Sequence, residues 1–169
     1  MNVIETERLN LREMSEADAG VVLAILNDPG FIRFVGDRGV RTLEAAARYI
    51  DERFAESYRQ NGFGLWLVET KDGRVPVGIC GLLTRKELGV VEVGYAFLPP
   101  FRGKGYAYEA ASAALRHARD VLGLPRLHAV VDPENAASIR VLEKLGMKFE
   151  RPIKLTPEES EVNLFSTDL

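Results

Sequence analysis

The stretch from Val90 to Ala110, VVEVGYAFLPPFRGKGYAYEA, constrains the fold more than any other part of the sequence. Its β-branched and aromatic residues predict a strand over 90–98, which a double proline ends. An alanine-rich helix follows, with small apolar residues at three- and four-residue spacing from Ala107 to Leu122. Gly123 then stops it. The chain is therefore predicted to pass from a strand through a glycine turn directly into a helix.

The predicted helix start has no capping side chain to accept hydrogen bonds from its first N–H groups. No Ser, Thr, Asp or Asn stands at the N-cap position, and Lys104 adds charge to the positive end of the helix dipole. Gly103 and Gly105 can adopt backbone angles closed to other residues, so the N–H groups of 103–107 can converge on one phosphate. The alternative is a plain glycine-rich turn with solvated Arg102 and Lys104.

Two better-known glycine motifs do not fit this turn. A P-loop needs Ser or Thr after its Gly-Lys step, but Gly105 stands there. A dinucleotide fingerprint needs a third glycine where this chain has Tyr108, whose side chain obstructs close packing of helix and strand. A nicotinamide-dependent oxidoreductase is accordingly disfavoured.

Periodicity and turn residues predict the other elements. The segment NDPGFIRFVGDRGVR reads as a loop. Strands over a meander, followed by a strand, helix and strand, predict a mixed α/β (α+β) sheet with helices on both faces, in one domain spanning 1–169. The remaining predicted elements are a strand at Thr6–Arg12, a helix from the Ser15/Asp18 capping box to about Leu26, a helix over Thr42–Gln60, strands at Phe63–Glu69, Pro76–Leu83 and Arg126–Val131, a short helix ended by Gly146, and strands at about Lys148–Leu155 and Val162–Ser166, with turns at KDGR and RKELG.

The composition is that of a soluble globular chain: 46% hydrophobic, 28% charged and a net charge of −3. This balance gives no support to nucleic-acid binding. No apolar run could span a bilayer, and the N-terminus lacks a signal-peptide core, so we expect a cytoplasmic protein without a membrane partner. No metal-ligand spacing occurs, and the expected oligomeric state is a monomer or a homodimer.

Two blocks of the sequence match known signatures. Arg102, Gly105 and Ala107 fit the acyl-CoA-binding pattern [QR]-x-x-G-x-[GA]. RLHAVVDPENAASIRVLEKLGMKF resembles the block that follows it, with Met147 where a Phe is usual. The sequence thus resembles the GCN5-related N-acetyltransferase (GNAT) superfamily over nearly the whole chain. IETERLNLREMSEADA and VEVGYAFLPPFRGKGYAYEA look most like its RimJ/RimL branch.

The resemblance implies a mostly antiparallel sheet of six or seven strands and an N-acetyltransferase that uses acetyl-CoA. The acetyl group would pass directly to a primary amine, either a protein N-terminus or a small molecule. A non-catalytic acyl-CoA-binding sensor is the alternative reading.

The resemblance also implies where the cofactor binds. The strand at 91–98 splays from the strand at 126–131, and pantetheine lies between them. A backbone N–H near Phe97 or Leu98 would face the thioester oxygen, and Asn135 would bond pantetheine as well as cap its helix. The pyrophosphate would lie on Arg102, Gly103, Lys104, Gly105, Tyr106 and Ala107.

Glu92 is the candidate general base, because it is the only carboxylate in an otherwise apolar strand. A buried carboxylate is a better proton acceptor than a solvated one and can remove a proton through a water. Val91 and Val93 alternate with Glu92, so the pattern alone equally allows an outward-pointing side chain. The superfamily often has a general-base Glu at about this distance before its signature, which favours the catalytic reading.

The general acid is harder to place. Many superfamily members carry a Tyr four residues before the glycine that ends the last helix, but that position is Leu142 here. Ser138, or a water, is then the candidate, and the alternative for Ser138 is a solvated helix residue.

Three other residue types have candidate or alternative roles. Phe31 and Phe34 are candidates to contact the acceptor, although core packing is the alternative. His117 and His128 are read as structural or solvated, because neither has a Cys or Asp partner at meaningful spacing. Cys80 lies in a predicted buried strand, which argues against a covalent route.

Overall fold

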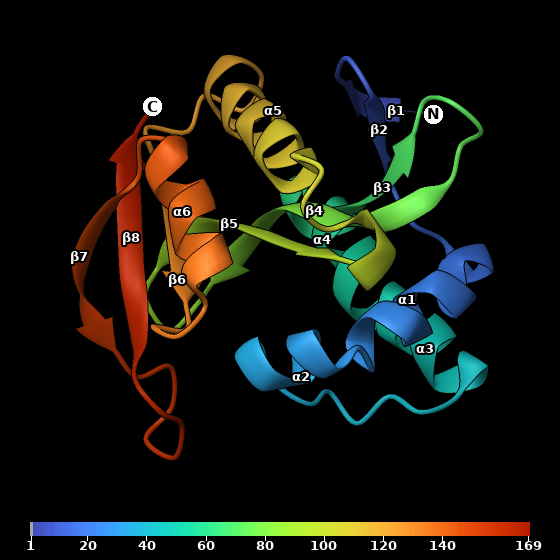
Figure 1. The fold of residues 1–169 in the computed structure, drawn as a ribbon, viewed down its shortest axis with the longest axis horizontal. Helices are drawn as coiled ribbons and strands as arrows, with labels where there is room; N and C mark the ends of the chain where they lie inside the picture. The colour runs from blue at the N-terminus through green and yellow to red at the C-terminus, as the bar shows by residue number, and fades with distance from the viewer. Residues whose placement is uncertain (1) are drawn as a thin grey trace.

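The computed structural model describes residues 2–169, and in them an eight-stranded mixed sheet runs through the molecule with helices on both faces (Figure 1). The spatial order is β1-β2-β3-β4-β5-β6-β8-β7, and every neighbouring pair is antiparallel except β5 and β6. The strands are β1 (Asn2–Glu5), β2 (Leu9–Arg12), β3 (Leu65–Thr70), β4 (Pro76–Arg85), β5 (Val90–Phe97), β6 (Arg126–Val131), β7 (Lys148–Ile153) and β8 (Val162–Asp168).

The helices divide into two groups by the face of the sheet that they cover. One group packs on the core that contains Trp66 and the other on the core that contains Leu67, its neighbour on the same strand. The first group is α5 (Tyr106–Asp120) and α6 (Ala136–Lys144); the second is α1 (Ala19–Leu26), α2 (Pro29–Phe34), α3 (Leu43–Tyr49) and α4 (Glu56–Asn61), with short turns of helix at η1 (Glu16–Asp18), η2 (Ile50–Ala55) and η3 (Pro99–Phe101). No helix of residues 2–169 has both the length and the apolar character to cross a membrane.

The predicted fold class and most elements are confirmed, and the differences have local causes. The strand predicted at Thr6–Arg12 begins only at Leu9, because Thr6–Arg8 form the turn between β1 and β2, in which the Thr6 N–H and hydroxyl donate to the Leu9 carbonyl. The helix predicted over Thr42–Gln60 is present, but its middle third, Ile50–Ala55, winds as a π-helix. The sheet has eight strands and not the expected six or seven, because β1 was not predicted.

The predicted loop after α1 contains a helix, α2. Asp28 caps it by accepting a hydrogen bond from the Phe31 N–H at 3.0 Å, and Pro29 occupies the first helical position. Asp followed by Pro is a helix-start signal, and the short length of the segment concealed it.

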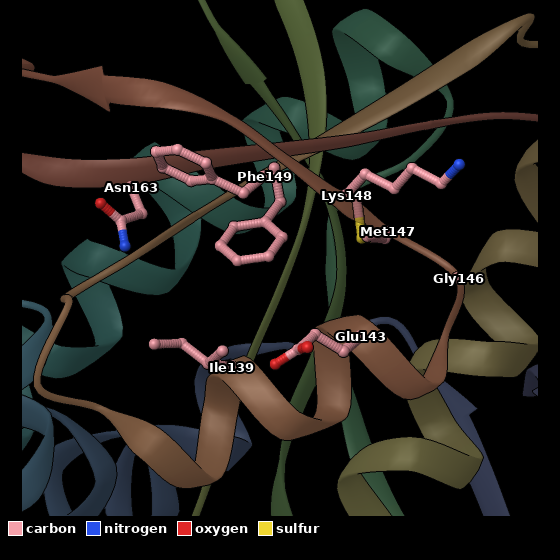
Figure 2. A pocket seen from close by; sticks show the side chains of 8 residues that line it. Ile139, Glu143, Gly146, Met147, Lys148, Phe149 and Asn163 are labelled. Carbon is pink, nitrogen blue, oxygen red and sulfur yellow. The ribbon is translucent and has the colours of Figure 1, made fainter.

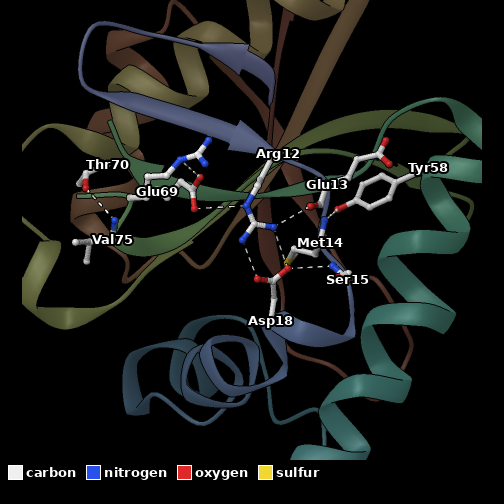
Figure 3. Close-up of polar contacts among 10 residues, drawn as sticks. Arg12, Glu13, Met14, Ser15, Asp18, Tyr58, Glu69, Thr70 and Val75 are labelled. Carbon is white, nitrogen blue, oxygen red and sulfur yellow. Dashed lines mark hydrogen bonds and ion pairs between the residues drawn. The ribbon is translucent and has the colours of Figure 1, made fainter. Parts of the chain in front are cut away.

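The first helical region is fixed to the sheet by Arg12 of β2 (Figure 3). Its guanidinium donates to both oxygens of Asp18 at 2.8 and 3.0 Å and to Glu69 of β3 at 3.4 Å. Burial alone would raise the pKa of Asp18, but the hydrogen bonds from Arg12 and from the Ser15 N–H hold that pKa below its usual value. The Ser15/Asp18 capping box is thus confirmed, with η1 as its first turn.

Candidate active site

The candidate site lies where the sheet divides. β5 pairs with β4 along its whole length, whereas β5 and β6 share one registered position, Glu92 opposite His128. Beyond that pair Val93–Phe97 and Ala129–Val131 share no register, so the two strands diverge, as the resemblance implied. Apart from Phe31 and Phe34 of α2, the predicted site residues belong to β5 or to the loops and helices that follow β5 and β6.

The turn before α5 has the conformation that the glycines predicted. Gly103 and Gly105 have φ of 76° and 82°, in the left-handed region, and Gly105 is the N-cap. No side chain caps this 15-residue helix. The first N–H groups of α5 therefore lack the usual acceptor, and phosphate oxygens fit them by charge and by hydrogen bonding.

Arg8, from the turn between β1 and β2, fixes the shape of this loop. Its guanidinium donates to the Lys104 carbonyl at 2.9 Å and to Glu109 of α5 at 2.7 Å, and it lies over the Tyr106 ring at 4.6 Å. Thr6 also donates to Glu109. Burial opposes ionisation of Glu109, but hydrogen bonds from Thr6 and Arg8 lower its pKa. Arg8 and Glu109 are 101 residues apart, and no local sequence signal predicts their contact.

The Arg102 guanidinium binds other residues of the protein and is not free to bind phosphate. Its Nε donates to the Phe97 carbonyl at 2.9 Å, and its Nη2 donates to Asp28 Oδ2 at 2.5 Å. Asp28 is buried and at the same time caps α2. Arg102 therefore ties the turn before α5 to α2, and Lys104 is the other cation of that turn.

Arg102→Gln is therefore expected to destabilise the fold more than it weakens CoA binding. Losing the guanidinium leaves the Asp28 carboxylate buried without its charged donor, a cost of about 2 kcal/mol in the free energy of unfolding. The CoA dissociation constant should stay within about threefold, because the Arg102 guanidinium is already bound to the Phe97 carbonyl and to Asp28. Urea unfolding and calorimetric titration measure the two quantities. Lys104→Gln is the control and should show the reverse pattern, so a large loss of CoA affinity in Arg102→Gln alone would contradict this assignment.

Glu92 is 3% exposed and does not point into solvent. Both of its carboxylate oxygens accept hydrogen bonds from Arg85, each at 2.8 Å. The hydrogen bond to Glu92 raises the pKa of Arg85 against the effect of burial. Arg85 was predicted to begin a turn, but β4 continues through it, and the last residues of β4 lie opposite the first of β5.

At the start of α6, Asn135 and Ser138 are both placed by hydrogen bonds. Asn135 caps the helix, with its Oδ1 accepting from the Ser138 N–H at 3.2 Å. The Ser138 hydroxyl lies 2.7 Å from the hydroxyl of Tyr95 on β5. Burial raises the pKa of Tyr95 to about 12. Leu142 is buried in the core. Sequence analysis did not single out Tyr95, because nothing in an aromatic strand marks one Tyr as different.

The two backbone groups predicted to bind the thioester differ in availability. The Leu98 N–H already donates to the Val77 carbonyl at 3.0 Å. Because N–H directions alternate along a strand, the Phe97 N–H then points away from β4 and toward the divergence. Phe97 thus has the available donor and Leu98 does not.

α2 carries Phe31 and Phe34, the candidate acceptor contacts. Phe31 packs against the second core, and the Arg33 guanidinium covers the Phe34 ring at 4.6 Å. Arg33 also reaches Glu134, in the turn before α6, at 3.4 Å. With Asp28 bound to Arg102 at its other end, α2 links the loop that follows β5 to the loop that follows β6.

The remaining titratable candidates are one buried cysteine and two partly buried histidines. Cys80 is fully buried, and burial raises the pKa of its thiol, which disfavours a reactive thiolate. His117 packs edge-on against Trp66 with ring centroids 5.5 Å apart. Burial lowers the pKa of both His117 and His128. His128 Nδ1 is buried with no hydrogen-bond partner.

A separate pocket lies between α6 and the strands β7 and β8 (Figure 2). Ile139 and Glu143 of α6 face Phe149 across it, and Phe149 is half exposed. None of the predicted site residues contributes to its lining, which consists of Ile139, Glu143, Gly146, Met147, Lys148, Phe149, Asn163 and Phe165.

Comparisons with known proteins agree with this geometry. Residues 8–148 match the acetyltransferase (GNAT) domain family. The N-acetyltransferase YoaA of Bacillus subtilis is 31% identical over 150 residues, covering 88% of this chain and 84% of YoaA. A GNAT-family acetyltransferase structure from Bacillus anthracis superposes with a TM-score of 0.81 at 25% identity, covering 98% and 97% of the two chains.

A more distant structure shows the fold together with a ligand. The RimL ribosomal L7/L12 alpha-N-protein acetyltransferase, solved in complex with coenzyme A, has a TM-score of 0.83 at 15% identity, with 100% and 98% of the chains covered. The extent of the family match and the similarity to YoaA are decisive. The chain belongs to the GNAT acetyltransferase family, and it is an N-acetyltransferase that uses acetyl-CoA.

Proposed function

We propose that the acetyl group passes directly from acetyl-CoA to a primary amine in a ternary complex, with Glu92 as the group that receives the amine proton. The observation that carries this proposal is the position of Glu92, a buried carboxylate at the point where β5 and β6 diverge. The uncapped start of α5 lies beyond the other end of β5. An anion site and a proton acceptor thus bracket one strand.

The chain has suitable groups to hold the donor. Acetyl-CoA, when bound, supplies an activated thioester. The Phe97 N–H is the candidate donor to the thioester oxygen, a type of contact that contributes about 3 kcal/mol to barrier reduction. Asn135 caps α6, and its side-chain amide is the proposed partner for pantetheine. The pyrophosphate contacts belong to the backbone of Gly103, Lys104, Gly105, Tyr106 and Ala107.

Arg85 gives Glu92 a fixed orientation. Two parallel hydrogen bonds hold the carboxylate plane, which leaves its outer lone pairs as acceptors for a water. A water between Glu92 and the amine then carries the proton. Ser138 is the proposed donor on the opposite side, toward the leaving sulfur.

The acceptor is proposed to be either a protein N-terminal amine or a small amine. The RimL structure shares the fold, and RimL is an alpha-N-protein acetyltransferase of ribosomal L7/L12. The spermidine N(1)-acetyltransferase of Escherichia coli is 40% identical over 52 residues, 31% of this chain. Both acceptor classes present an amine, and they differ in what α2 and its Phe31 and Phe34 would contact.

The test combines a thermal-shift titration with a turnover assay. CoA or acetyl-CoA at about one hundred times its dissociation constant should add roughly 2.7 kcal/mol, a shift of about 5 to 10 °C for this size of domain. NADPH and ATP serve as controls and should give none. CoA release is then followed with spermidine and with peptides that begin with Ala or Ser. Turnover with none of these amines, despite CoA binding, would refute direct transfer to either class.

A further inference from the structure

Tyr95 and Ser138 form a hydroxyl pair that bridges β5 and α6 beside the divergence. Their hydroxyl oxygens are 2.7 Å apart, and the Tyr95 hydroxyl also lies 3.3 Å from the Ser138 carbonyl. The Ser138 N–H is held by Asn135. The serine is therefore fixed both by its helix cap and by the phenol.

Either hydroxyl of the pair can be the donor. Burial raises the pKa of Tyr95 to about 12, so the phenol keeps its proton at physiological pH. Cys80, directly opposite Tyr95 on β4, is buried and its raised pKa keeps it neutral. Tyr95 can therefore donate to Ser138 Oγ, the nearer oxygen, or to the Ser138 carbonyl throughout this range. A serine hydroxyl that accepts from a phenol has its own proton free for another acceptor.

We propose that Tyr95 is a positioning residue that holds the Ser138 hydroxyl as a hydrogen-bond donor to the thioester sulfur. This inference rests on the proposed function, because it requires pantetheine to lie in the divergence. When the C–S bond breaks, its electron pair leaves with the sulfur, and the Ser138 hydrogen bond stabilises the resulting thiolate. The thiolate later takes its proton from solvent, and Tyr95 stays protonated. The pair thus supplies a hydrogen-bond donor to the leaving sulfur. Leu142 cannot supply one, because its side chain is apolar.

The first test measures binding rather than turnover. Calorimetric titration at pH 9, where much of the CoA thiol is ionised and Tyr95 is still protonated, compares CoA with desulfo-CoA, in which hydrogen replaces the thiol. The wild type should prefer CoA by about tenfold, the size of one hydrogen bond to a charged group. Tyr95→Phe and Ser138→Ala should both remove this preference and leave desulfo-CoA affinity unchanged.

Tyr58→Phe is the matched control. Tyr58 is a largely buried tyrosine whose hydroxyl bonds the Leu65 carbonyl, away from α6. Its loss should lower stability as much as Tyr95→Phe does, yet preserve the preference for CoA. A preference that persists in Tyr95→Phe would overturn the inference.

Turnover supplies the second test. Tyr95→Phe, Ser138→Ala and the double variant should each lower kcat by about tenfold with an unchanged KM for acetyl-CoA, because residues that act as a unit are non-additive. Additive losses would show that the two hydroxyls act separately and would overturn the inference. If the wild type releases no CoA with any amine, the proposed function fails, while the desulfo-CoA comparison still decides the role of Tyr95.

Discussion

Replacing Glu92 with Gln is expected to lower kcat by about 10²-fold or more, because general-base catalysis contributes on that order and an amide cannot accept the amine proton. The CoA dissociation constant should change by less than about threefold, since no proposed contact with CoA involves this side chain. Stopped-time assays of CoA release give kcat, and calorimetry gives the affinity. Gln preserves the shape of Glu92 and can still accept one hydrogen bond from Arg85.

Arg85→Gln is the control that separates catalysis from structure. It breaks the same ion pair from the other side and leaves Glu92 as a carboxylate. Both variants should lose stability, because each leaves a partly buried charge without its partner. If Glu92 is only a structural partner, the two variants will also lose turnover equally. A Glu92→Gln enzyme with nearly wild-type kcat would remove Glu92 as the base.

The second large effect is expected from Gly105→Ala. A left-handed conformation costs a residue with a Cβ about 1–2 kcal/mol, and Gly105 has φ of 82°. The new Cβ would also lie 3.3 Å from the Arg8 guanidinium that holds the loop. The loop should relax, its N–H groups should lose their common direction, and CoA affinity should fall about tenfold or more.

Gly123→Ala is the matched control for Gly105→Ala. It introduces the same Cβ at another left-handed glycine, away from the proposed CoA site. Gly123 has φ of 65°, lies just beyond the other end of α5, and a Cβ there would meet nothing within 4 Å. Both variants should lose similar free energy of unfolding in urea, but only Gly105→Ala should bind CoA more weakly. Equal CoA affinities would mean that the turn at Gly105 is a structural turn only.

Local signals made most of the fold predictable. The prolines after β5, the glycines before α5 and the capping box at Ser15 act within a few residues, so they can be read along the chain. The α2 signal was equally local, and only the shortness of its helix led to a loop prediction. The π-helical winding of Ile50–Ala55 has no comparable signal, because its residues are ordinary helix formers.

The partners within the candidate site could not be predicted in the same way. Arg102 and Asp28 are 74 residues apart, and Tyr95 and Ser138 are 43 apart. Each pair is made by tertiary packing, which periodicity does not encode. Glu92 was identifiable because a carboxylate stands out in an apolar strand. Its partner Arg85 was predicted to lie in a turn, and their pairing follows only once β4 is known to extend through Arg85.

A sheet that divides has four edges rather than two. The outer edges of this sheet are β1 and β7, and the divergence adds inner edges on β5 and β6 beyond Glu92 and His128. Exposed edges invite pairing with other chains, but residues on both inner edges, among them Phe97 and Ala129, belong to the buried core, which restricts the access of a foreign strand. They present a ladder of peptide groups suited to a slender amide-bearing chain. The enzyme can thus keep unpaired backbone N–H and C=O groups on β5 and β6 with less risk of self-association than an open outer edge brings.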